Sequence, residues 1–341
     1  MRHTLALLAI LIGSTTLGAI ERGGGQRIKD VAPTGSRSQA MGHATDKAMA
    51  WLYAHPASVA ENELMEVVEE IMFYYALDSI SGNSDMHESY RREIGKRHQA
   101  ILDFNKENLD RRLHLQGDWA ALTYPPLAHI ITNVGLDAGP YRTIIDDVIS
   151  HKRYPDPSRN AMQLWIAVYL ERLGYTPVQP AISLLNNSSL QRDPETRELL
   201  VFFLDKDASG ENPPATIQLI YNITHEIIAL TDFGAHQPPA VMTAQLDHYA
   251  SLIDAAIGWA MHESAIDVLA ELIFCVRLLG LGDLPSLPGA LDLIVNSQQD
   301  DGSFGITNPD RPNGKRHGVL TCILALKSME NDTRTEARPS L

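Results

Sequence analysis

Apolar residues recur with the three-to-four-residue spacing of α-helices from about residue 44 onward. Turn-forming residues interrupt this pattern roughly every 15 to 25 positions, as expected for helices of ordinary length. Strand-like alternation is hard to find. The pattern therefore predicts an all-α protein, with helices at 44–54, 61–78, 86–105, 124–134, 140–151, 158–173, 195–204, 214–231, 241–262, 265–280, 287–298 and 317–329.

The expected helices differ in how apolar residues are distributed around their axes. Segments 46–54 and 141–150 are amphipathic, which is typical of helices bordering solvent. Four others are apolar almost all round, as buried helices are: 162–173, 217–230, 266–279 and 319–326. Paired outer and inner helices would explain this alternation, so we expect an α/α toroid of about six helical hairpins. An open α-solenoid of the same hairpins is the structural alternative.

Two of the apolar helices resemble each other in sequence. Residues 163–170 (QLWIAVYL) can be aligned with residues 271–278 (ELIFCVRL). Each segment continues to a Leu-Gly pair, ending at Gly174 and Gly282 respectively. Glycine after a helix favours a left-handed cap, so both helices are expected to end alike, which supports an internal repeat.

A Gln-x-x-x-Gly-x-aromatic element is formed near the C-terminus by Gln298, Gly302 and Phe304. It resembles the QW repeat of terpenoid cyclases and the related turn of protein prenyltransferases. In those α/α toroids the element ends an outer helix and leads into an inner one, and here an apolar helix opening at His317 follows. The resemblance covers the last hairpin, and the remainder only through helical periodicity. It therefore implies the fold more than an activity.

The motifs that carry the chemistry of those families are incomplete in this chain. No Asp-x-Asp-Asp acid motif lies on an apolar helix, and an aromatic content of 6% is low for a cavity that stabilises carbocations. Protein prenyltransferases bind zinc through Asp, Cys and a His that opens a late inner helix. The resemblance gives that place to His317, whereas the matching Asp and Cys cannot be assigned.

The charge of the chain limits its possible partners, and its two cysteines limit its possible covalent cross-links. A formal net charge of -14 and a pI near 5.3 argue against nucleic acid and anionic membrane surfaces. Cys275 and Cys322 both fall inside apolar helical patterns, which predicts buried thiols rather than a disulfide framework.

The N-terminal residues resemble a secretory signal peptide. Arg2 precedes an apolar run from Leu5 to Ile12 and small residues up to Ala19. We expect a signal peptide at 1–19, a flexible linker at 20–43, the toroid domain at 44–331 and a disordered tail at 332–341. Secretion or residence in the cell envelope follows, without stable membrane insertion of the mature domain. A membrane anchor, or an overextended start on a cytoplasmic protein, is the alternative.

Ionisable residues interrupt the apolar helix around residues 221–234, where His225, Glu226 and Asp232 occur. Burying such groups costs several kcal/mol unless they are paired or ligated. On the next expected inner helix, Asp267 and Glu271 are separated by four positions and share a face. His317 opens the helix after that.

In a toroid these helices would face one central cavity. The residues then predicted to bind a divalent metal, Zn or Fe, are His225, Asp267, Glu271 and His317. Glu226 or Asp232 would handle a proton during hydrolysis or elimination of a small-molecule or peptide substrate. His129 could line the same cavity.

Each residue also has a structural interpretation. His225 could be a hydrogen-bonded core histidine, Asp232 could end its helix, and Asp267 could stabilise a helix N-terminus. Glu271 could pair with Arg277. Two further hypotheses therefore stay open: a metal-free cyclase or lyase with a carboxylate acid and His225 as base, and a non-catalytic binding toroid.

Overall fold

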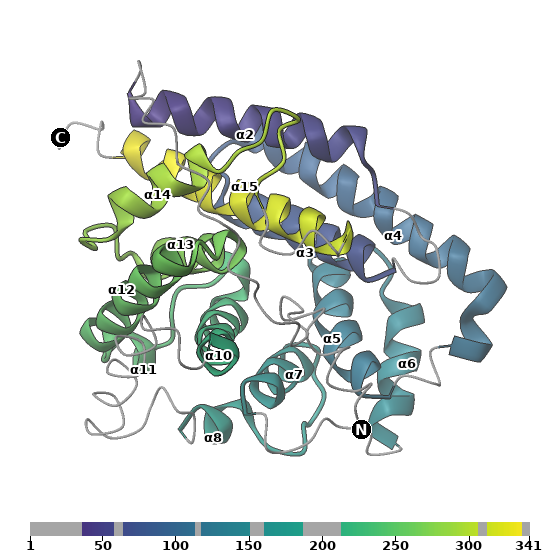
Figure 1. Ribbon diagram of the computed structural model, residues 1–341. Coiled ribbons are helices and arrows are strands. Elements are labelled where there is room, and N and C mark those ends of the chain that lie inside the picture. Colours follow the sequence, from purple (N-terminus) through teal and green to yellow (C-terminus); the bar gives the residue numbers. More distant parts are fainter. Residues whose placement is uncertain are drawn as a thin grey trace. The chain divides into compact units, whose positions relative to one another are not determined.

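The computed structural model describes residues 36–57, 64–112, 117–150, 160–186, 213–305 and 312–335. Over these ranges the protein is all-α, as predicted, and the only β feature is a single bridge between Gln298 and Phe304. Figure 1 shows the helices: α2 (Arg37–Ala54), α3 (Leu64–Ile80), α4 (Ser84–Arg112), α5 (Gly117–Asn133), α6 (Gly139–Ser150), α7 (Asn160–Arg172), α8 (Ala181–Asn186), α10 (Pro213–Thr231), the 3-10 turn η2 (Asp232–Gly234), α11 (Ala240–Thr243), α12 (Leu246–Glu263), α13 (Ile266–Leu279), α14 (Leu287–Asn296) and α15 (Pro312–Thr335).

The chain divides into two compact units, where the sequence predicted one domain at 44–331. Unit 1 comprises Met1–Pro56, Val201–Tyr221 and Asp247–Leu341, and unit 2 comprises Ala57–Leu200 and Asn222–Leu246. The division falls inside α10, between Tyr221 and Asn222. The two units are described separately below.

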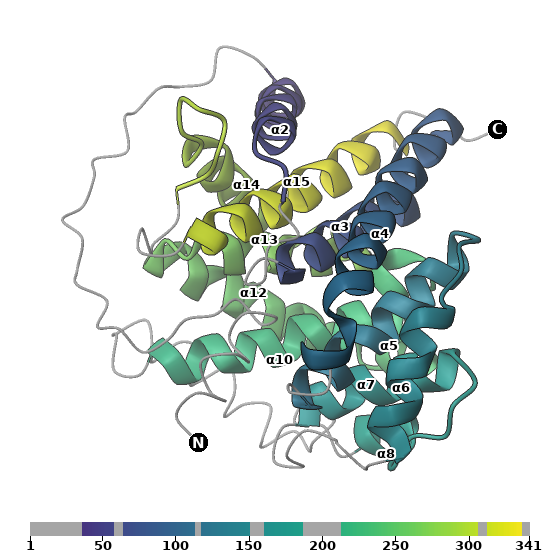
Figure 2. The same cartoon turned by 90° about the vertical axis from the view of Figure 1, so that its right-hand side faces the viewer.

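Unit 2 is built from helical hairpins. The apolar helix α3 packs against the polar helix α4, and three residues, 81–83, connect them (Figure 2). Helix α5 packs against α3, α6 and α7, and α7 packs against α8. Thus α5 and α7 lie in the interior of this unit, and polar side chains on them require partners.

Two consecutive prolines, Pro125 and Pro126, lie inside α5. The sequence predicted a helix from residue 124, yet α5 begins at Gly117. Proline has no N–H, so Pro126 leaves the carbonyl of Leu122 without its helical donor. The indole Nε1 of Trp165 on α7 donates to this carbonyl at 3.2 Å. The tertiary contact satisfies the oxygen that the proline frees.

The core of unit 1 is the pair α13 and α15, which lie side by side (Figure 1). Eleven of the 14 residues of α13 are buried, so α13 is enclosed on nearly all sides. Helix α2 packs against α15 and α14. Cys275 and Cys322 are both free and buried in this core, as predicted.

The element resembling a QW repeat fastens α2 to the rest of unit 1. Gln298 Nε2 donates to the carbonyls of Ala44 on α2, at 2.7 Å, and of Gly302, at 3.0 Å. Gly302 has a φ of +93°, and a Cβ at this position would lie 2.5 Å from the carbonyl oxygen of Lys47. Only glycine permits both the backbone conformation and the approach of α2.

Several expected boundaries were wrong. Gly174 follows α7 in the left-handed conformation, as predicted, but α13 is capped by Gly280 at φ +69° rather than by Gly282. The helix expected at 241–262 is broken at 244–245 into α11 and α12, and α8 was missed. Residues 37–43, expected in the linker, are the start of α2.

Other expectations fall outside the described residues. These are the helix at 195–204, the signal peptide at 1–19 and most of the tail. Across the ranges that are described, no helix has the length and apolar character needed to cross a membrane.

Replacing Gly302 by alanine should lower the free energy of unfolding by about 2 kcal/mol or more, because the methyl group collides with Lys47 and the residue is strained at positive φ. Gly258 on α12 is the matched control, since nothing lies within 4 Å of its Cβ position. Gly258→Ala should stabilise by about 0.5–1 kcal/mol. Urea denaturation measures both, and equal effects would contradict the fastening role.

Candidate functional site

The chain reverses its handedness where α10 ends. Asp232, Phe233 and Gly234 have φ values of +51°, +55° and +94° in succession. Left-handed geometry costs roughly 1 kcal/mol or more at each non-glycine residue, so two such residues in a row require compensation. The turn is closed by a hydrogen bond from the backbone N–H of His236 to the carbonyl of Thr231, at 2.9 Å.

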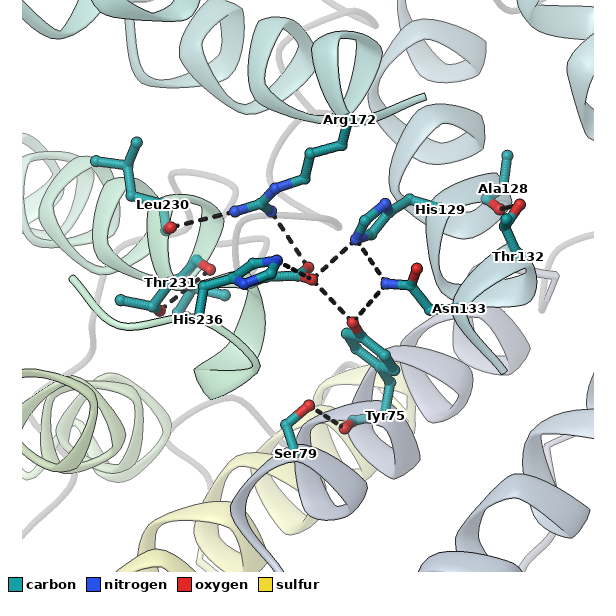
Figure 3. A network of polar contacts seen from close by, with 12 residues as sticks. Tyr75, Ser79, Ala128, His129, Thr132, Asn133, Arg172, Leu230, Thr231 and His236 are labelled. Carbon is teal, nitrogen blue, oxygen red and sulfur yellow. Dashed lines mark hydrogen bonds and ion pairs between the residues drawn. The ribbon is translucent and has the colours of Figure 1, made fainter. Parts of the chain in front are cut away.

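The fully buried carboxylate of Asp232 is held by three helices. Tyr75 on α3 donates its hydroxyl to Oδ2 at 2.8 Å, and Nε2 of His129 on α5 lies 2.8 Å from the same oxygen. Nη1 of Arg172 on α7 lies 3.2 Å from Oδ1. Figure 3 shows Tyr75, His129 and Arg172 directed toward this common centre.

Protonation at this centre follows from charge. Burial pushes the pKa of the Asp232 carboxyl upward, but the hydrogen bond from His129 and the charges of His129 and Arg172 bring the pKa below its ordinary value. Asp232 is therefore ionised at neutral pH. A carboxylate only accepts hydrogen bonds, so Nε2 of His129 must carry the proton between them.

The amide of Asn133 contacts both Tyr75 and His129. Its Nδ2 atom donates to the hydroxyl of Tyr75 at 2.9 Å, and that hydroxyl donates its own proton to Asp232. Nδ2 also lies 2.9 Å from Nε2 of His129, and this contact is not a hydrogen bond when Nε2 carries the proton, because both atoms are then donors. Asn133 thus lies against two partners of Asp232.

This arrangement makes His129 a candidate base. With the proton fixed on Nε2 by Asp232, the neutral imidazole has its lone pair on Nδ1. Within the described part of the chain, both polar contacts of His129, with Asp232 and with Asn133, involve Nε2. A carboxylate that fixes the tautomer and stabilises the imidazolium is the device used in acyl-transfer triads.

The network continues from the interior to the surface. Tyr75 and His129 are buried, whereas Asn133 is exposed. The side chain of His236 is 58% exposed, and its Nε2 lies 3.7 Å from Oδ2 of Asp232. Burial and the Asp232 charge raise the pKa of Tyr75, so the phenol remains a donor at neutral pH. The polar groups thus lead from solvent to the carboxylate.

A second His–carboxylate pair lies in unit 1. Nε2 of His317 on α15 is 3.3 Å from Oε1 of Glu271 on α13. Asp267 lies in the first turn of α13 and accepts a hydrogen bond from the backbone of Val268. Burial, reinforced by Glu271 and opposed by His317, raises the pKa of Asp267. Burial and these two carboxylates also raise the pKa of Tyr221.

The residues predicted to form one metal site are distributed over both units. Unit 1 contains Asp267, Glu271 and His317, and unit 2 contains His225. His225 is partly buried, with its ring 5.8 Å from that of Trp165. Among the described residues, no three His, Cys, Asp or Glu side chains form a recognisable metal-binding group. The metal therefore stays a prediction.

The two residues predicted to move protons belong to unit 2. Asp232 is at the centre of the network described above, and Glu226 is buried on α10. Sequence reasoning missed Arg172 and Asn133, and it gave His129 only a place in the lining of a cavity. One signal was present: His129 and Asn133 are four residues apart and share a helix face.

Comparison with known protein families places the chain in a family, but the description of that family names no activity. Residues 82–317 match the model described as "Domain of unknown function (DUF6895)", which covers well over half of the chain. The chain belongs to this family. No curated protein gave a match. Within the DUF6895 region lie His129, Asn133, Arg172 and Asp232, whereas Tyr75 precedes it.

Asp232→Asn should destabilise unit 2 by about 3 kcal/mol at pH 7, because it leaves Arg172 without its buried counter-charge. The folded pKa of Asp232 is lowered, so its stabilisation is present above the unfolded pKa of roughly 4 and is lost as the pH falls through the folded pKa. Urea denaturation between pH 2 and 7 should therefore show that the free energy of unfolding falls less steeply on acidification in the variant than in the wild-type protein.

The control is Asp292→Asn, which removes an ion pair with Arg37 whose two side chains are each 48% exposed. Its effect should stay below about 1 kcal/mol. If both variants cost the same at pH 7, the proposed ionisation of Asp232 would be contradicted.

Proposed function

We propose that unit 2 contains a metal-free acid–base site and that the protein is a hydrolase or lyase. The observation that carries this proposal is the 2.8 Å contact between His129 Nε2 and the buried, ionised carboxylate of Asp232. A purely structural ion pair needs only Arg172 beside Asp232. The additional histidine and the polar connection to the surface at His236 favour proton transfer.

In the proposed reaction, Nδ1 of His129 takes a proton from water or from the substrate. In hydrolysis the oxygen of that water attacks as its proton leaves, and the imidazolium later returns the proton to the leaving group. In elimination the proton comes from a C–H bond. Asp232 stabilises the imidazolium, and Arg172 keeps Asp232 ionised. The base in this proposal is His129, in place of His225.

His129→Gln should lower turnover by a factor of about 10²–10⁴, the usual contribution of a general base. The measurement is an activity screen of the full chain against esters, amides and substrates with acidic C–H bonds. His43→Gln, an exposed histidine on α2, is the control and should retain full activity. An activity that is unchanged in His129→Gln would overturn the proposal.

A second candidate is the predicted metal enzyme, now centred on unit 1. The observation in its favour is the 3.3 Å contact between His317 and Glu271, with Asp267 one turn away from Glu271. One imidazole and two carboxylates are ligand types that suit Zn or Fe, but the three side chains do not converge as a metal-binding group in the described structure, so a metal would have to draw them together. The metal would activate water or polarise a small-molecule or peptide substrate.

Elemental analysis of the purified protein tests this second candidate. We expect about one equivalent of Zn or Fe, as for a mononuclear site. His317→Ala should lose the metal, whereas His262→Ala, an exposed histidine of the same unit, should retain it. Metal-free wild-type protein that resists reconstitution with either ion would exclude this candidate.

We further propose the α/α toroid for the chain and export by the N-terminal segment. Paired helices such as α3–α4 and α13–α14, together with the element at Gln298, support the toroid. An experimental structure tests it. If neither activity nor metal is found, the non-catalytic binding toroid is the remaining hypothesis.

A further inference from the structure

We infer that unit 2 binds a neutral hydroxyl group, from water or a substrate alcohol, between Asp232, Arg172 and Tyr169. This inference concerns the same centre as the proposed acid–base site and specifies what that site holds. It rests on hydrogen-bonding geometry, and its first test does not require catalytic activity.

Three buried polar atoms at this centre have no aligned hydrogen-bond partner among the described residues: Oδ1 of Asp232, Nη1 of Arg172 and the hydroxyl of Tyr169. Nη1 and Oδ1 are 3.2 Å apart and attract each other as an ion pair, but without hydrogen-bond alignment. Arg172 is fixed by a different nitrogen, since its Nη2 donates to the carbonyl of Leu230 at 3.1 Å.

Tyr169 belongs to the same cluster. It is 0% exposed, and the Arg172 guanidinium lies 5.2 Å from the centre of its ring. Burial, the nearby charge of Asp232 and a hydrogen-bond contact with that carboxylate raise the pKa of its phenol, so the hydroxyl keeps its proton. The hydroxyl is thus close to the carboxylate, but the contact between them is poorly aligned. Unsatisfied buried polar groups are costly, and three at one place indicate a polar ligand.

The charges select the kind of ligand. A group held here must accept a hydrogen bond from Arg172 and donate one to Oδ1 of Asp232. An anion would be repelled by Asp232, and a cation would be repelled by Arg172. A hydroxyl group is neutral, donates and accepts at once, and can also bond to Tyr169.

The position relative to His129 gives this subsite a role. The rings of Tyr169 and His129 are 5.4 Å apart, and both His129 and the subsite contact Asp232. A hydroxyl held there bonds to the carboxylate that orients the proposed base, on the side of the ring that carries Nε2 rather than at the basic Nδ1. If it is water, it helps Arg172 to hold Asp232 in place, and the nucleophile of hydrolysis is a different water at Nδ1. If it is a substrate alcohol, the substrate class is hydroxylated compounds.

Tyr169→Phe gives the first test, because the size of its effect on stability depends on occupancy. If the hydroxyl of Tyr169 bonds to a ligand or water, its removal should raise the unfolding equilibrium constant about tenfold. If the hydroxyl has only its poorly aligned contact with Asp232, removal should change the constant by less than about threefold, which would overturn the inference. Tyr141→Phe is the matched control, since Tyr141 is equally buried in unit 2 and its hydroxyl bonds to His98 at 2.9 Å.

A second test separates the two sources of the hydroxyl. The 15N signals of His129 are followed during titration with glycerol, a neutral alcohol, and with sodium acetate. Saturable binding of glycerol alone, weakened about tenfold in Tyr169→Phe, would support a substrate alcohol. No glycerol binding, but a water within hydrogen-bond distance of all three atoms in a high-resolution crystal structure, would support the water.

The absence of both signals would overturn the inference. The two proposals can fail separately. An active His129→Gln variant removes the catalytic role of His129, whereas a neutral Tyr169→Phe variant removes only the hydroxyl subsite.

Discussion

Unit 2 depends on the compensation of one buried charge. An isolated carboxylate with the burial of Asp232 would take up a proton or unfold its surroundings. Its compensation requires Tyr75, His129 and Arg172 to arrive from α3, α5 and α7. The carboxylate therefore couples the positions of three helices to the end of a fourth. The same coupling that stabilises the unit pre-organises the imidazole of His129.

The backbone at Asp232 is strained, and aromatic packing offsets the strain. Phe233, the second left-handed residue, contacts Tyr75 and Trp165 edge-on, with ring centres 6.1 and 5.9 Å away. Such pairs contribute roughly 0.5–1.5 kcal/mol each beyond the burial of their area. Trp165 also bonds to the carbonyl freed by Pro126. One indole thus supports both the irregular turn and the irregular helix beside the site.

Periodicity predicted the helices well because helix formation is a local property of the chain. It failed where a tertiary contact overrides local preference, since Trp165 supports the passage of α5 through Pro125 and Pro126. It also chose the wrong one of two nearby glycines, because Gly280 rather than Gly282 caps α13. The site was harder to predict. Asp232 could be identified as an ionisable residue in an apolar setting, but Tyr75 and His129 lie 157 and 103 residues from it. No short-range pattern connects such positions.

Each of the two His–carboxylate pairs joins an imidazole to a carboxyl group, but their surroundings differ in charge balance. Asp232 has Arg172 beside it, and its pKa is lowered, so the centre in unit 2 holds an anion that orients a histidine. Asp267 is buried with Glu271 nearby, and its pKa is raised, so the centre in unit 1 makes ionisation of this carboxyl less favourable. One permanent cation therefore separates an acceptor from a potential acid. Environments that push the pKa values of like groups apart are how proteins divide acid and base roles. Arg172, which the sequence did not single out, makes Asp232 the partner of a base.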